Sequence, residues 1–206
     1  KGNTDERAPY GMVDSLEISA AVGEFVKFSV SMKGGKIEDS TATPSFLTGT
    51  ADEAFRASKV TVKVAADISS LSGASAIAIQ NIKFSLAKNL MPVFKLGATT
   101  IDAMVNQQFG VTGDLELVYD ANTYRDYFTA NTKKALQIEI EGATLIGATK
   151  YNKLTIQFAQ VHLESWDRSS DNNALVSETI GFVGEYSFGD TQTMNMVLQN
   201  TKSANY

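Results

Sequence analysis

The chain has 206 residues and a formal net charge of −5, from 18 basic and 23 acidic side chains. This length accommodates one domain or two small ones, and the acidic balance argues against a protein that grips nucleic acid phosphates. The chain has no cysteine and one histidine, His162, which excludes thiolate chemistry and metal sites built from several imidazoles. We expect no metal and no cofactor. No apolar run approaches the ~18 residues of a membrane-spanning helix, so we expect no membrane partner.

The dominant pattern is an alternation of apolar and polar residues. It occurs, in chain order, in residues 26–32, 60–64, 82–86, 114–117, 137–141, 153–158, 180–186 and 194–198. Because successive side chains of a strand point to opposite faces, each segment presents one apolar and one polar face. Clean alternation is typical of antiparallel sheets that are packed on one side only. We therefore predict an all-β fold, an antiparallel β-sandwich or a partly closed barrel.

Two segments favour helical structure instead. Residues 122–135 carry Tyr124, Tyr127 and Phe128 at helical spacing, and they follow Asp120 and Asn122, either of which can cap a helix. We predict one short α-helix there, packed across a sheet. Residues 67–78 are rich in small side chains, which predicts a second turn of helix.

The remaining irregular segments are the N-terminus and one long connection. Residues 1–12 are charged and predict an N-terminal arm, and residues 13–206 are predicted to form a single β domain. Within this domain the connection 34–58 is much longer than a hairpin loop of roughly 2–5 residues. Such loops are commonly functional or mobile. Its apolar residues in an otherwise polar segment are Ile37, Phe46, Leu47 and Phe55.

Several short matches to catalytic motifs fail on their chemistry. Residues 142–147 have the glycine spacing of a phosphate-binding loop, but the required lysine is missing, so a turn between strands is predicted. Ser85 and Lys88, together with residues 170–172, match two elements of penicillin-recognising enzymes, but the third element is absent. His162 lies on the polar face of a predicted strand, and no nucleophile or oxyanion hole is evident. We predict no catalytic site and no enzyme.

A group of oxygen-bearing side chains follows Trp166. Asp167 and residues 171–173 could offer ligands to calcium, but their spacing does not fit the EF-hand loop. A turn rich in aspartate and asparagine is the simpler interpretation.

Acidic residues occupy the polar face of two predicted strands. These residues are Asp114, Glu116, Glu139 and Glu141. In a monomer such a face is simply solvated. In a ring it could line a channel, and a negative channel would repel DNA phosphates and let DNA pass without sticking.

Several runs of the sequence resemble the major tail tube proteins of long-tailed, siphophage-type bacteriophages. The runs are residues 13–18, 23–34, 106–117 and 177–182. Together with shorter matches between them, the similarity spans most of residues 13–188. Its motifs are strand patterns and contain no catalytic signature.

The resemblance implies a β-sandwich subunit with a flanking helix that forms hexameric rings, which stack into the tail tube. The lumen would hold the tape-measure protein and conduct DNA into the host without sequence-specific binding, and other tail proteins would meet the tube ends. The protein would be made in the host cytoplasm and reside in the virion tail. In this setting Ile37, Phe46, Leu47 and Phe55 are the predicted contact between rings, and Asp114, Glu116, Glu139 and Glu141 are the predicted lumen face.

A second function class stays open on the sequence alone. A β-sandwich carbohydrate-binding module would stack sugars on Trp166, Tyr119, Tyr124 and Tyr127. Residues 171–173 would then hold calcium.

Overall fold

The computed structural model describes residues 5–7, 10–35, 37–40, 54–98, 100–146, 149–169 and 175–200. The chain divides into two compact units. Unit 1 consists of Lys1–Glu17, Phe28–Asp52 and Ser85–Gly110. Unit 2 consists of Ile18–Lys27, Glu53–Phe84 and Val111–Tyr206.

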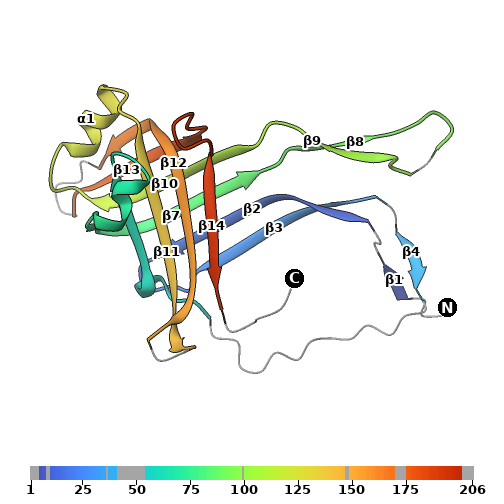
Figure 1. Ribbon diagram of the computed structural model, residues 1–206, viewed down its shortest axis with the longest axis horizontal. Coiled ribbons are helices and arrows are strands. Elements are labelled where there is room, and N and C mark those ends of the chain that lie inside the picture. The colour runs from blue at the N-terminus through green and yellow to red at the C-terminus, as the bar shows by residue number, and fades with distance from the viewer. Residues whose placement is uncertain are drawn as a thin grey trace. The chain divides into compact units, whose positions relative to one another are not determined.

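The described residues are mostly strands (Figure 1). The strands are β1 (Asp5–Arg7), β2 (Gly11–Ala21), β3 (Lys27–Gly34), β4 (Glu38–Ser40), β5 (Val60–Ala65), β6 (Ala76–Ile77), β7 (Ile79–Ala87), β8 (Leu90–Val93), β9 (Ala103–Asn106), β10 (Gly110–Val118), β11 (Lys134–Leu145), β12 (Tyr151–Arg168), β13 (Ser177–Glu185) and β14 (Met194–Gln199). The helices are η1 (Ala57–Lys59), η2 (Ser69–Gly73) and α1 (Thr123–Thr129). The prediction of an all-β fold with one short α-helix is confirmed. Among these described helices, none has the length and apolar character needed to cross a bilayer.

Strands β2, β3, β7 and β10 have residues in both units. The single domain over residues 13–206 therefore stays a prediction. The predicted arm, residues 1–12, contains β1 and the start of β2. The predicted loop, residues 34–58, contains β4 and most of η1.

Unit 1 contains two short antiparallel ladders, β1 with β4 and β8 with β9. Asp14 on β2 ties further strands together. Its Oδ1 accepts a hydrogen bond from the Leu90 backbone N–H at 2.7 Å, and its Oδ2 lies 3.1 Å from Lys33 Nζ. Lys33 Nζ also donates to the Leu90 carbonyl at 2.8 Å. The Leu90 hydrogen bond chiefly, and then Lys33, hold the pKa of Asp14 below its ordinary value of 3.8.

Unit 2 is built on a sheet with the strand order β2-β7-β10-β13-β12-β11-β5-β6. β12 is 18 residues long, and it pairs with β11 along one edge and with β13 and β14 in succession along the other (Figure 1). A register shift between Leu163 and Ser165 bends β12 where it pairs with β13.

Three phenylalanines mark the centre of the unit 2 core. Phe84 on β7 and Phe158 on β12 lie edge to face with ring centroids 5.7 Å apart, and Phe182 on β13 lies 6.1 Å from Phe158. Because β7 and β12 are not neighbours in the strand order, their contact requires the sheet to curl over its own apolar face. This curling agrees with the predicted partly closed barrel.

The Phe182 ring occupies the space beside Gly113 on β10. A Cβ atom at residue 113 would lie 2.5 Å from Phe182 Cζ and 2.7 Å from the Lys83 backbone oxygen. Real Cβ atoms do not approach so closely, so only glycine fits at this position of the strand.

The helical segments are shorter than predicted. α1 ends at Thr129 rather than continuing to residue 135, because the alternating pattern of β11 begins at Lys134. Asn122 occupies the N-cap position, but its side chain accepts a hydrogen bond from Tyr119 Oη at 2.7 Å and does not cap the helix. In residues 67–78 the structure has η2 and β6.

Replacing Gly113 with alanine is expected to destabilise the protein by about 1–3 kcal/mol, because the added methyl group overpacks against the Phe182 ring and the strand backbone. Gly110→Ala, on the same strand but with no atom within 4 Å of the added Cβ, is the matched control. Urea unfolding followed by circular dichroism measures both. Equal losses in the two variants would contradict this account of the core.

Asp14→Asn is expected to lower stability at neutral pH, because the amide cannot pair with Lys33 as a charge. The depressed pKa of Asp14 means that its stabilising effect is complete above the ordinary carboxyl pKa and is lost as the pH falls through the lower folded value. The difference in urea midpoint between wild type and Asp14→Asn should therefore shrink between pH 7 and pH 3. A difference that is independent of pH would indicate that the charge plays no part.

Candidate functional site

The four acidic residues predicted to line a channel all lie in unit 2 and point away from its core. On β10, Asp114 and Glu116 alternate with buried Leu115 and Leu117. On β11, Glu139 and Glu141 alternate in the same way with Ile138 and Ile140, which are also buried. In the strand order β13 and β12 separate these two pairs. The structure thus places the carboxylates on polar strand faces, as two groups rather than one cluster.

The charges on these faces are only partly negative. Lys153 Nζ, on β12, lies 3.3 Å from Glu139 Oε1, and both side chains are about one quarter to one third exposed. Among the described residues, Asp114, Glu116 and Glu141 form no ion pair. Uncompensated negative charge therefore belongs to these three carboxylates, while the charge of Glu139 is neutralised locally.

His162 belongs to a cluster of charged groups on β12 and β13. Its Nδ1 lies 2.9 Å from Glu185 Oε1, although the contact is not aligned as a hydrogen bond and becomes an ion pair only when the imidazole is protonated. Lys133 Nζ lies 2.7 Å from Glu185 Oε2. The hydrogen bond from Lys133 is the main cause that lowers the pKa of Glu185. This arrangement is an ion-pair cluster between neighbouring strands and brings no nucleophile to the imidazole.

The predicted contact loop is described only at its two ends. Ile37 is exposed immediately before β4. Phe55 is half-buried, and its carbonyl accepts a hydrogen bond from the Val26 N–H at 2.8 Å. Phe46 and Leu47 lie outside the described residues, so their role stays a prediction.

The aromatic residues considered as sugar platforms are engaged inside unit 2. Trp166 Nε1 donates to Glu178 Oε2 at 2.8 Å, and Glu178 is 1% exposed. Burial, followed by the nearby Glu178, raises the pKa of Tyr124 to about 12. Arg168 lies over the Tyr119 ring. These contacts hold the aromatic side chains in the protein's own packing, and residues 171–173 lie outside the described residues.

Sequence reasoning missed an exposed apolar row on β3. The alternation in residues 26–32 predicts one apolar face, yet Phe28, Val30 and Met32 are 45%, 52% and 63% exposed. Among the described residues β3 ends the strand order and pairs only with β2. An alternating pattern reveals that a face is apolar but not whether the same chain or another one covers it. Exposed apolar rows of this kind mark interaction surfaces.

A family model described as "Phage tail tube protein" matches residues 2–193. No curated protein matches the chain. Three solved structures are similar to it at low identity. The first, the SPP1 tail tube, is 12% identical with a TM-score of 0.46, and the match covers 69% of this chain and 79% of that one.

The second, from the virion of a native gene transfer agent particle, is 14% identical with a TM-score of 0.44, covering 69% of this chain and 97% of that one. The third, from the baseplate of the anti-feeding prophage, is 12% identical with a TM-score of 0.48, covering 76% and 99%. The assignment rests on the family model, which spans nearly the whole chain. The chain belongs to the phage tail tube protein family and is a structural subunit of the virion tail.

Proposed function

We propose that copies of this chain close into hexameric rings that stack to form the tail tube. The lumen holds the tape-measure protein and conducts DNA into the host, and other tail proteins meet the tube ends. The role is structural and involves no catalysis. The protein is made in the host cytoplasm and then incorporated into the virion.

The observation that carries this proposal is the apolar row on β3. Phe28, Val30 and Met32 alternate along a strand that has a neighbour on one edge only, so both the row and the free edge lack a partner within the described residues. Unpaired strand edges promote uncontrolled aggregation unless they are covered, and a closed ring covers every edge with the next copy. A ring of identical subunits therefore accounts for an edge that a monomeric protein would avoid.

The acidic strand faces are proposed to line the lumen. Asp114, Glu116 and Glu141 supply the negative field, because Lys153 neutralises Glu139. Like charges keep DNA phosphates away from the wall, which favours free passage over binding. The loop residues Ile37, Phe46, Leu47 and Phe55 are proposed to contribute to the contact between rings.

Negative-stain electron microscopy of the concentrated protein tests ring formation. Wild type is expected to give rings or hollow tubes with sixfold averages. Val30→Glu should leave the subunit folded, because Val30 is half exposed, but should abolish rings by placing a carboxylate in the apolar contact. Val30→Ile is the matched control and should assemble normally. Rings formed by Val30→Glu at the wild-type concentration would refute the role of β3.

Charge reversal tests the lumen assignment. Asp114→Lys and Glu116→Lys are each expected to permit folding and tube assembly but to reduce infectivity, because a positive wall retains DNA. Asp126→Lys on exposed α1 makes the same change in net charge outside the proposed lumen. Phage complementation assays measure infectivity, and electron microscopy confirms that tails are present. Normal infectivity of both β10 variants would exclude this face from the lumen.

A further inference from the structure

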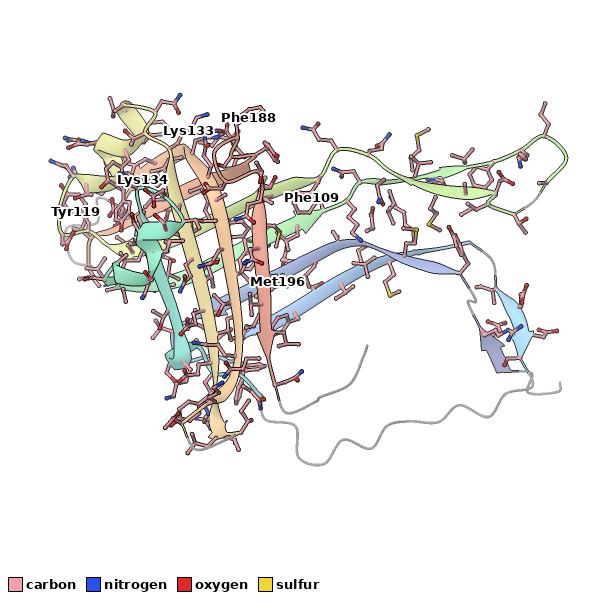
Figure 2. All side chains as sticks on the ribbon, viewed as in Figure 1. Phe109, Tyr119, Lys133, Lys134, Phe188 and Met196 are labelled. Atoms are coloured by element: carbon pink, nitrogen blue, oxygen red, sulfur yellow. The ribbon has the colours of Figure 1, made fainter. Side chains whose placement is uncertain are left out.

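The turn between β13 and β14 presents an aromatic pair to solvent. The rings of Tyr186 and Phe188 lie edge to face with centroids 5.3 Å apart, and Phe188 is 88% exposed (Figure 2). Burying an exposed phenylalanine against another surface is strongly favourable, and rigid aromatic side chains are frequent anchors of protein interfaces.

This turn is held in one conformation by its own hydrogen bonds. The Ser187 N–H donates to the Gln192 carbonyl at 3.0 Å, and Ser187 Oγ donates to Asp190 Oδ2 at 2.8 Å. Thr191 has a φ of +54°, a region that β-branched residues rarely adopt. A preorganised turn loses little conformational freedom when its aromatic ring is buried, which increases the affinity it can provide.

A shallow apolar hollow lies elsewhere on unit 2. Its lining includes Ala21, Val22, Ala57, Val60 and Ile79. These side chains are small or aliphatic, and Val22 is 74% exposed. The hollow can therefore accept an aromatic ring without displacing the backbone around it.

The aromatic turn and the hollow lie at opposite ends of the same strands. In the ladders, Met194 pairs with Phe158, Phe158 with Leu136, and Leu136 with Val64, so the turn lies at the Val64 end of β5. Val60, in the hollow, is at the other end of this six-residue strand. Figure 2 shows Phe188 at one end of β12 and β14. Two surfaces at opposite ends of one body form a heterologous contact, which repeats along a line when copies stack.

The charges beside the two surfaces are complementary. Asp190 is exposed in the turn next to Phe188. Beside the hollow, Arg56 lies over the Phe25 ring at 5.5 Å and Lys59 over the Tyr151 ring at 5.8 Å. Within the described residues neither Arg56 nor Lys59 forms an ion pair, so both are available to a carboxylate from another molecule.

We propose that Phe188 of one copy packs on the hollow of a second copy in the next ring, with Asp190 facing Arg56 and Lys59. The contact rests on the proposed stacking of rings, and it assigns that stacking to particular residues. The hollow includes Ala57, at the carboxyl end of the long connection 34–58, so this contact adjoins the loop that is also proposed to join rings.

Disulfide trapping tests the contact directly, because the chain has no cysteine of its own. A variant with both Phe188→Cys and Val22→Cys cannot cross-link within one copy, since the two sites lie at opposite ends of unit 2. After mild oxidation of assembled tubes, non-reducing gels should show a ladder of dimers, trimers and longer chains. Each single-cysteine variant should remain monomeric. Tubes of the double variant that run as monomers would overturn the proposal.

Phe188→Ala gives a second measurement. It should leave the unfolding midpoint unchanged and raise the protein concentration needed for tubes by roughly tenfold or more, with single rings still forming. Leu175→Ala, another exposed apolar truncation in unit 2, should assemble as wild type does. Equal tube formation by Phe188→Ala and wild type, or an equal loss in Leu175→Ala, would overturn the contact. Absence of both rings and tubes from wild type would instead overturn the proposed function.

Discussion

The packing of Phe182 against the bare backbone at Gly113 is the constraint on which unit 2 depends. The ring takes the space that a side chain of β10 would otherwise fill, and this lets the sheet curl until Phe84 and Phe158 meet. Interiors of proteins are close-packed, so the curl can be maintained only if such a ring fits without voids or overlap. The curled sheet then directs one set of side chains inward and leaves the polar set, including the four carboxylates, on the outside.

The strands were predictable from the sequence because their signal is local. Alternating residues such as Ile138 and Ile140 against Glu139 and Glu141 specify a strand with one dry face whatever lies beside it. The end of α1 was not, because helical spacing of Tyr124, Tyr127 and Phe128 carries no information on where the next strand begins. The pairing of Glu139 with Lys153 was also beyond prediction, since it depends on the register between β11 and β12.

The interaction surfaces illustrate a second limit of local patterns. The apolar residues of β3 have the same alternation as core strands, so the sequence assigned them to a buried face, whereas the structure exposes them. Phe188 lies in a turn and belongs to no periodic pattern. Both surfaces become recognisable only when burial is known, because an apolar side chain without cover is informative and an apolar side chain alone is not.

The Asp14 contacts give unit 1 a role beyond its own stability. By joining β2 to Lys33 on β3 and to the start of β8, Asp14 links the open-edged strand to the rest of the unit. A strand fixed in this way is a template that already has the shape its neighbour requires.

The exposed row on β3 also limits the free subunit in time. From synthesis until incorporation, each copy carries an unpaired, apolar strand that can associate with any similar edge it meets. Collisions between free copies increase with their concentration, so correct growth depends on tube ends consuming subunits faster than they accumulate. The rate at which a cell supplies this protein is therefore coupled to the rate at which tails are built, and the coupling originates in three side chains of one strand.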